Sequence, residues 1–156
     1  MKRKDFEAKQ VKKMTIEEML EPFAALRVGV LATVEEGRPY TSIIAFALPP
    51  DRRTLLFTTS SATRKYKNII SQPAVSILLD NRSQSADDIS RAQAVTLLGT
   101  AKKLRAGAKK SEYSALFISR HPELADFIDD PKTALIAVNI QQAVHVARFE
   151  DVSVWP

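Results

Sequence analysis

A cluster of hydroxyl and basic side chains lies between two apolar segments in the first half of the chain. The apolar run 55–59 ends in Thr58 and Thr59, and Thr63 is followed at once by the basic pair Arg64–Lys65. The residues after Thr63 have the pattern of a short helix. Hydroxyls, backbone N–H groups and cations at a strand-to-helix junction form a good site for a phosphate. We therefore predict that this segment holds the phosphate of a bound cofactor.

Each of these residues also has a structural interpretation. Thr58, Thr59 and Thr63 suit a strand and a helix N-cap whether or not a ligand is present. Arg64 and Lys65 are poorly placed as ordinary surface charges, because the N-terminal end of a helix carries a partial positive charge. A bound anion would remove that conflict, so the basic pair favours a binding role.

Composition indicates one globular domain. The 156 residues are 45% hydrophobic and 26% charged, which allows a substantial core. No apolar run approaches the roughly 20 residues needed to span a bilayer, and no signal-peptide core follows the basic N-terminus, so we expect a cytoplasmic protein without a membrane partner. The chain has no cysteine and two histidines, so we expect neither disulfides nor a metal site.

The net charge of +5 comes largely from the segments Lys2–Lys13 and Lys102–Lys110. Neither segment has interleaved aromatic residues or a recognisable motif for nucleic acid, so we expect solvated surfaces and no nucleic-acid partner. A basic chain also suits an anionic, phosphorylated ligand.

The order of elements predicts an antiparallel β-structure with inserted helices. We expect residues 1–14 to form a basic arm and 15–156 a single domain. Thr15 and Glu18 fit a capping box, and Pro22 divides the first helical stretch. Gly99 suggests a bulge or barrel corner within its strand. The predicted strands begin at Val28 and then cover Tyr40–Leu48, Thr54–Thr59, Ala74–Asp80, Gln93–Leu104 and a final hairpin of Ala134–Ile140 and Ala143–Phe149 around Gln141–Gln142; the predicted helices cover Thr63–Ile70, 107–120 and Pro122–Ile128.

Four segments in sequence order resemble the pyridoxamine 5′-phosphate oxidase-like FMN-binding split-barrel proteins. They read GVLATVEEGRPYTSIIAF, LLFTTSSATRKYKNI, QPAVSILLDNR and VTLLGTAKKL. The resemblance covers most of residues 16–105. It implies a mainly β (α+β) fold, a six-stranded antiparallel split β-barrel with short flanking helices. It also implies a homodimer that binds FMN in a cleft between the subunits.

Carried over by position, the resemblance also implies site residues. Thr63, Arg64 and Lys65 would contact the phosphate, and Thr58 and Thr59 would lie near the ribityl chain or the phosphate. The remaining expected contacts run along the flavin ring, partly through backbone groups: Ser42, Ile43, Ile44 and Ala45.

The chain departs from the true oxidases of that family. They carry an Arg at the position of Ser42 and a Lys at the position of Ala47, and neither charge is present here. Their C-terminal Arg-x-His substrate motif is also missing, since the tail reads HVARFEDVSVWP. We therefore do not predict pyridoxamine phosphate oxidase activity.

Several further residues have more than one interpretation. Asn81 ends a predicted strand and either forms a turn or reaches the cofactor or a neighbouring subunit. Trp155 packs on the core, on a dimer partner or against the flavin ring. Gln93 either faces solvent or serves in the site. His121 and His145 are the only imidazoles available as haem ligands, although a structural role is the simpler reading for both.

Two classes of function fit these features. The first is an FMN-dependent oxidoreductase of unknown substrate, in which the flavin carries the chemistry and the protein supplies orientation and exclusion of water. The second is a non-catalytic module that binds or stores flavin or haem. A deazaflavin in place of FMN is a third possibility, because it is also anionic.

Overall fold

Alternating apolar residues fold most of the chain into a curved antiparallel sheet that closes on itself. The computed structural model describes residues 12–84, 87–148 and 151–156. Most of the predicted basic arm, and Phe149 of the predicted last strand, lie outside these ranges. The strands are β1 (Val28–Glu35), β2 (Arg38–Ala47), β3 (Thr54–Ser60), β4 (Ala74–Asp80), β5 (Gln93–Lys103), β6 (Thr133–Ala147) and β7 (Asp151–Trp155).

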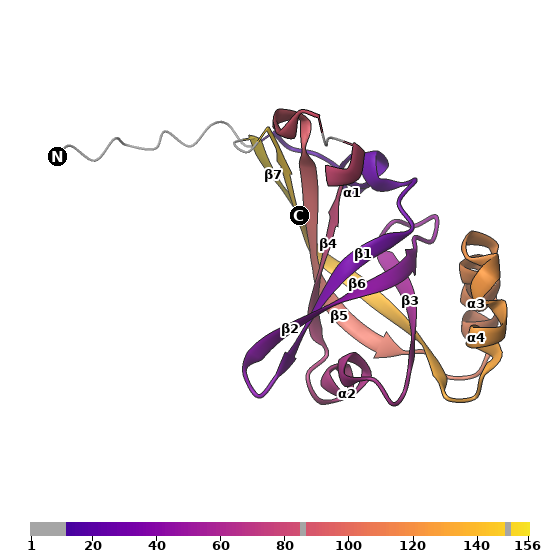
Figure 1. The fold of residues 1–156 in the computed structure, drawn as a ribbon. Helices are drawn as coiled ribbons and strands as arrows, with labels where there is room; N and C mark the ends of the chain where they lie inside the picture. The colour runs from indigo at the N-terminus through magenta and orange to yellow at the C-terminus, as the bar shows by residue number, and fades with distance from the viewer. Residues whose placement is uncertain (1–11, 85–86, 149–150) are drawn as a thin grey trace.

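The strand order is β3-β2-β1-β4-β5-β6-β7, and an additional pairing of β3 with β6 closes the barrel. Strands β1 to β6 therefore form a six-stranded antiparallel barrel, and β7 extends the sheet beyond β6 (Figure 1). The mainly β, split-barrel prediction is confirmed.

Helices connect and cover the strands. In the described ranges they are α1 (Ile16–Leu20), α2 (Arg64–Ser71), α3 (Ala108–Arg120) and α4 (Ala125–Asp129), with 3-10 turns at Glu21–Phe23, Arg82–Gln84, Ile89–Arg91 and Pro122–Leu124. The predicted capping box is present at the start of α1, and Pro22 lies in the 3-10 turn that follows this helix. Both expectations about the first helical stretch are confirmed.

The barrel interior holds the main hydrophobic core. Leu31 on β1, Phe57 on β3 and Leu97 on β5 are fully or almost fully buried there. Their neighbours along each strand point outward, because side chains alternate between the faces of a strand. One end of the barrel is covered by α1 and the following turn, whose Met19 and Phe23 are completely buried in the same cluster.

A second apolar cluster lies outside the barrel, beneath α3 and α4. Ala47 on β2, Leu56 on β3 and Leu135 on β6 pack there against Tyr113 and Phe117 of α3. Figure 1 shows these two helices side by side against one flank of the barrel. Ala47 occupies a buried position in this layer, at 3% exposure, where the true oxidases carry a lysine.

The predicted C-terminal hairpin is wrong. Residues 134–147 belong to one continuous strand, β6, which pairs with β3 through its first half and with β7 through its last residues. The polar pair Gln141–Gln142 resembles a turn in sequence, but both side chains are exposed on a strand. The pairing with β5 skips Gln141, because Leu98 faces Gln142 and Gly99 faces Ile140. The extra residue is accommodated as a bulge, and the bulge predicted at Gly99 is confirmed.

Candidate functional site

The N-terminal end of α2 has the local geometry of an anion site. Thr63 caps the helix, and its Oγ1 accepts from the N–H of Tyr66 at 3.3 Å. The same hydroxyl lies 2.7 Å from Oγ1 of Thr59 and donates to the carbonyl of Ser60 at 2.9 Å. These bonds hold β3 and α2 at a fixed angle. They also occupy the hydroxyls of Thr59 and Thr63, which therefore have a structural role in this chain.

Donors remain free at the first two positions of the helix. In the described part of the chain, the backbone N–H groups of Arg64 and Lys65 have no hydrogen-bond partner. Both point outward at the positive end of the helix dipole, beside two cationic side chains. Lys65 is half-buried and Arg64 exposed. This combination of two free amides and two cations fits an anion such as a phosphate.

Arg64 makes two contacts with the β1–β2 hairpin. Its Nε donates to Oε2 of Glu35 at 2.7 Å, and its Nη2 bonds the same oxygen. The guanidinium carbon lies 4.4 Å from the centre of the Tyr40 ring. Glu35 could not be predicted as a partner of Arg64, because the acid is 29 residues away in sequence and no local pattern links the two.

The four predicted ring contacts on β2 divide between two faces. Ser42 lies on the same face as Tyr40, since the two are two residues apart, and this is the face that Arg64 covers. The Oγ of Ser42 is buried and has no hydrogen-bond partner among the described residues. Ile44 follows on this face and is buried, whereas Ile43 points the other way and is 71% exposed. Ala45 shares the face of Ile43 and is half-buried.

Thr58 is also separated from the phosphate motif. It pairs with Leu135 and shares the outward face of β3 with Leu56, so its side chain points away from Thr59 and Thr63. The structure therefore places Thr59, Thr63, Arg64 and Lys65 together at the β3–α2 junction, and Ser42 lies two residues along β2 from Tyr40, which Arg64 contacts. The side chains of Ile43, Ala45 and Thr58 point to other faces.

Asn81 and Trp155 lie far from α2 within one chain. Asn81 follows β4, whose seven residues separate it from the α2 end of that strand by about 20 Å. Its Oδ1 accepts from the N–H of Gln93 at 2.7 Å, which closes the loop 81–91. Trp155 pairs with Ala143 and packs on the barrel core, and the guanidinium of Arg53 lies 5.3 Å from its ring.

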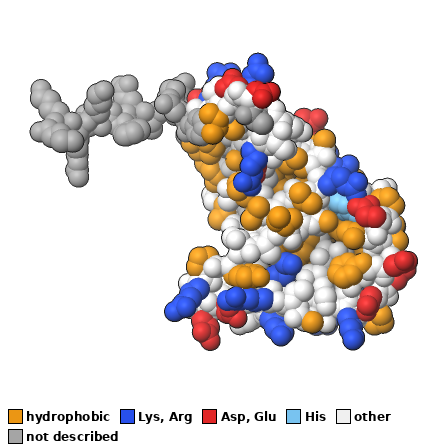
Figure 2. Space-filling model, in the orientation of Figure 1, with side chains coloured by type: hydrophobic (Ala, Val, Ile, Leu, Met, Phe, Trp, Pro, Cys, Tyr) orange, Lys and Arg blue, Asp and Glu red, His pale blue; other side chains and the backbone are white. Residues whose placement is uncertain are grey.

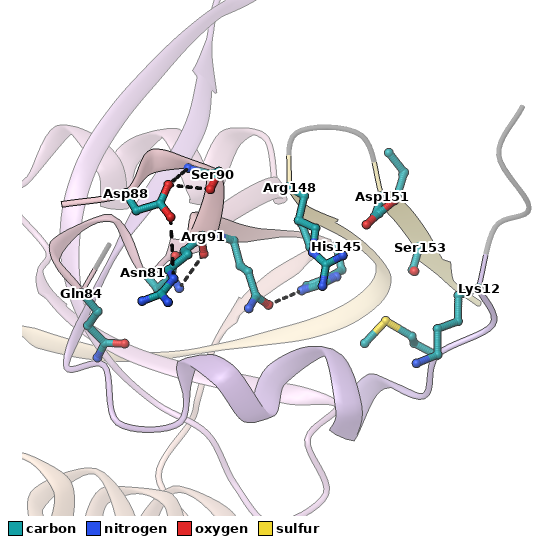
Figure 3. A pocket seen from close by; sticks show the side chains of 14 residues that line it. Lys12, Asn81, Gln84, Asp88, Ser90, Arg91, His145, Arg148, Asp151 and Ser153 are labelled. Atoms are coloured by element: carbon teal, nitrogen blue, oxygen red, sulfur yellow. Dashed lines mark hydrogen bonds and ion pairs between the residues drawn. The ribbon is translucent and has the colours of Figure 1, made fainter. Parts of the chain in front are cut away.

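A cavity of about 910 Å³ lies at this distant end of the barrel. Polar residues of the segment after β4 form one side, and the ends of β6 and β7 form the other (Figure 3). Its lining residues are Lys12, Met14, Asn81, Gln84, Asp88, Ser90, Arg91, Gln93, His145, Ala147, Arg148, Asp151, Val152 and Ser153.

His145 lies on the wall of this cavity and is only 6% exposed. Its Nε2 is 3.1 Å from Oε1 of Gln93, an oxygen that can only accept, so Nε2 carries the proton. Burial lowers the pKa of the His145 imidazole below its usual range. The ring is therefore neutral, and its Nδ1 keeps a lone pair. Gln93 does not simply face solvent, because its side chain is half-buried and positions the histidine.

A smaller cavity of about 370 Å³ lies between β2 and α3. Apolar side chains, among them Phe46 and Leu116, line part of it, and the cations Arg52 and Arg120 also line it. Among the residues that the structure describes, no acidic side chain lines it. Arg120 also donates to the carbonyls of Ala24 and Leu26, at 3.2 and 3.0 Å. This cavity begins on β2 directly after the predicted ring contacts.

Apolar side chains remain exposed on the outer face of the sheet. Cross-strand pairing places Ile43, Val30 and Leu78 in one row across β2, β1 and β4. We call this surface the outer apolar face; its members are Val28, Val30, Ile43, Leu78, Leu98, Val144 and Val152. The exposed fractions are 54% for Val28 and 71% for Ile43. Figure 2 shows apolar side chains over the middle of the molecule, with a few Lys and Arg side chains among them.

Two further observations concern metals and membranes. No group of three or more histidine, aspartate or glutamate side chains comes together as a metal site within residues 12–84, 87–148 and 151–156. Over the same ranges, no helix has the length and apolar character needed to cross a bilayer.

Comparison with known proteins identifies the family. The family model of pyridoxamine 5′-phosphate oxidase matches residues 15–147. The chain belongs to this family. No curated protein matches the sequence significantly.

Solved structures with the same fold include proteins that are named for different ligands. A heme binding protein from Mycobacterium smegmatis superposes with a TM-score of 0.80 at 22% identity, over 93% of this chain and 59% of that one. The heme storage protein HutZ from Vibrio cholerae gives 0.68 at 21% identity, over 82% and 92% of the two chains. A FAD-binding protein from Mesorhizobium loti gives 0.69 at 18% identity, over 88% and 97%. The chain thus spans less than two thirds of the mycobacterial protein, and at these identities the likeness concerns the fold.

Proposed function

We propose that this protein binds FMN in a cleft between two copies of the chain and transfers hydride or electrons through the flavin. The observation that carries the proposal is the start of α2. There, two backbone amides without a hydrogen-bond partner among the described residues lie beside the side chains of Arg64 and Lys65, and β2 carries the buried, unpaired hydroxyl of Ser42. Arg64 is suited to a bidentate grip on phosphate oxygens, and Lys65 adds a point charge.

A second copy of the chain would complete the site. Within one chain, Asn81 and the cavity of His145 lie at the opposite end of β4 from α2. An isologous dimer through the outer apolar face would bury Ile43 and Val28 against the same surface of the partner. Such a pairing offers a way to bring the α2 end of one protomer toward the large cavity of the other. It would also remove exposed apolar area that a monomer leaves in water.

Different parts of the chain would then have different roles in the site. The bound flavin would supply the redox chemistry, and the chain's own residues would bind and orient it. The cations at α2 would hold the phosphate, and the strand β2 would fix the orientation of the ring through its backbone. The cavity between β2 and α3 has room for a small second reactant, and the cations Arg52 and Arg120 that line it suit an anionic one.

Haem binding is the second candidate, and His145 is the observation that favours it. A neutral imidazole on the wall of a cavity of about 910 Å³, with no partner for Nδ1 among the described residues, has the chemistry of an axial haem ligand. Two of the structural neighbours are named as a heme binding and a heme storage protein. In this reading Arg91 and Arg148, which line the same cavity, would face the propionates.

Absorption spectra of the purified protein separate the two candidates. The protein is titrated with FMN and, in a parallel experiment, with haem. We expect saturable binding of FMN with the two-banded flavin spectrum, followed by bleaching of the bound flavin on addition of NADH or NADPH. A Soret band that is lost in His145→Ala, with no binding of FMN, would replace the flavin proposal by the haem one.

A further inference from the structure

An acid from another element already pairs with the proposed phosphate-binding arginine. Glu35 ends β1, and its Oε2 accepts from both Nε and Nη2 of Arg64. The first turn of α2 contains no acidic residue of its own. Glu35 therefore supplies, from the hairpin, the negative charge that the helix terminus and its cations attract.

The contacts of Glu35 use the part of Arg64 that a phosphate would need. Nε and Nη2 form one of the two edges through which a guanidinium grips two oxygens at once. Tyr40 covers one face of the guanidinium, with the ring centre 4.4 Å from its carbon. A phosphate that takes the Nε edge must displace Glu35, and one that takes the other edge must lie close to a carboxylate of like charge.

We propose that Glu35 is an intramolecular competitor for the cofactor phosphate and thereby sets how tightly the α2 site holds a phosphorylated ligand. This inference rests on the proposed function, because it concerns the same site. Both side chains are about half exposed, at 55% for Arg64 and 43% for Glu35. An ion pair of this exposure is weak and exchanges readily, so it attenuates phosphate binding without preventing it.

The competition depends on the charge of the ligand. A phosphate monoester carries nearly two negative charges at neutral pH, and each is repelled by Glu35. Riboflavin has the same ring and ribityl chain but no phosphate. Glu35 thus narrows the difference in affinity between FMN and riboflavin, and its neutralisation widens that difference.

The test compares Glu35→Gln with Glu36→Gln by quenching of flavin fluorescence on titration with protein. Glu36 is the neighbouring exposed residue in the hairpin turn, so the control makes the same change in net charge outside the ion pair. We expect Glu35→Gln to bind FMN about two- to fivefold more tightly, the range of a half-exposed ion pair, and to bind riboflavin as the unaltered protein does. Glu36→Gln should change FMN affinity by less than half of that effect.

A second pair of variants tests whether Glu35 acts through Arg64. In an Arg64→Ala background, Glu35→Gln should no longer tighten FMN binding, because the competing pair is already broken. Unchanged or weaker binding of FMN by Glu35→Gln, in a protein that binds FMN, overturns the inference and leaves the proposed function in place. A weaker affinity would make Glu35 a residue that positions Arg64 instead. Absence of FMN binding in the unaltered protein and in all variants overturns both.

Discussion

The imidazole of His121 joins two elements that are 75 residues apart in sequence, since its Nε2 lies 2.7 Å from the carbonyl oxygen of Phe46. His121 caps the C-terminus of α3 and is 1% exposed, and Phe46 lies on β2. The guanidinium of Arg27, which can only donate, is 3.3 Å from Nδ1. A carbonyl oxygen can only accept, so Nε2 donates to Phe46, and this hydrogen bond fastens α3 to the barrel.

Replacement of His121 should loosen this attachment. We expect His121→Ala to lower the free energy of unfolding by about 2–3 kcal/mol, because it leaves a buried carbonyl unpaired and removes a packed ring. His121→Gln can keep a donor near Phe46 and should cost less. Urea unfolding followed by circular dichroism measures both. Equal stability of the alanine variant and the unaltered protein would show that the bond contributes nothing.

The cations at the start of α2 should matter for the cofactor and little for the fold. We expect the double variant Arg64→Ala/Lys65→Ala to bind FMN at least tenfold more weakly, because each charge-assisted bond to a phosphate contributes about 1.5–3 kcal/mol. Its thermal midpoint should stay within a few degrees of the unaltered value, since both side chains are partly exposed. Fluorescence titration and thermal unfolding give the two readouts. Unchanged FMN affinity in the folded variant would remove the phosphate assignment.

The outer apolar face should control assembly. We expect Ile43→Lys to remain folded, because the side chain is 71% exposed within one chain, and to sediment as a monomer at micromolar concentration. A lysine there would have to be buried without a partner in the proposed dimer. Phe127→Lys on α4 is the matched control, because Phe127 is 39% exposed on a different surface. A protein that is monomeric without any substitution contradicts the shared cleft.

Acid should destabilise the fold in part through His145. Burial lowers the pKa of this imidazole in the folded state, so the unfolded chain binds the proton more readily. The neutral, buried imidazole therefore contributes fully to stability above the ordinary histidine pKa of about 6.5. This contribution is lost as the pH falls through the lowered pKa of His145 in the folded state. We expect His145→Gln to lose less stability than the unaltered protein between pH 7.5 and pH 5. Urea unfolding at both pH values measures this, and parallel losses in the two proteins would contradict it.

Gly99 should tolerate no side chain. A Cβ at this position would lie 2.3 Å from the carbonyl oxygen of Asn139 and 2.9 Å from Val138 Cγ1. The first of these is backbone that the bulge holds in place, so we expect Gly99→Ala to cost about 2–4 kcal/mol. Gly29→Ala is the comparison, since its closest contact is the end of the Leu79 side chain, at 2.6 Å, which can move. The midpoint of thermal unfolding should therefore be much lower for Gly99→Ala than for Gly29→Ala.

Much of the local structure could be predicted because its causes are local. Thr15 with Glu18, the N-cap Thr63 and the alternation along β1 to β5 act within a few residues, and each element appears where the sequence predicts it. The same kind of local signal gave a wrong prediction of a turn at Gln141–Gln142. Two polar residues look alike in a turn and on a solvent-facing strand, and only the pairing of β6 with β3, β5 and β7 distinguishes them.

The sequence by itself determined the β-barrel class and the strand-to-helix junction, and it predicted an anion site at Arg64 and Lys65. Only the tertiary structure decided which groups meet. It brought Glu35 to Arg64, Gln93 to His145 and His121 to Phe46, and it turned Thr58 away from Thr63. The physical reason is that such contacts follow from strand register and chain closure over 29 to 75 residues, for which a sequence carries no periodic signal.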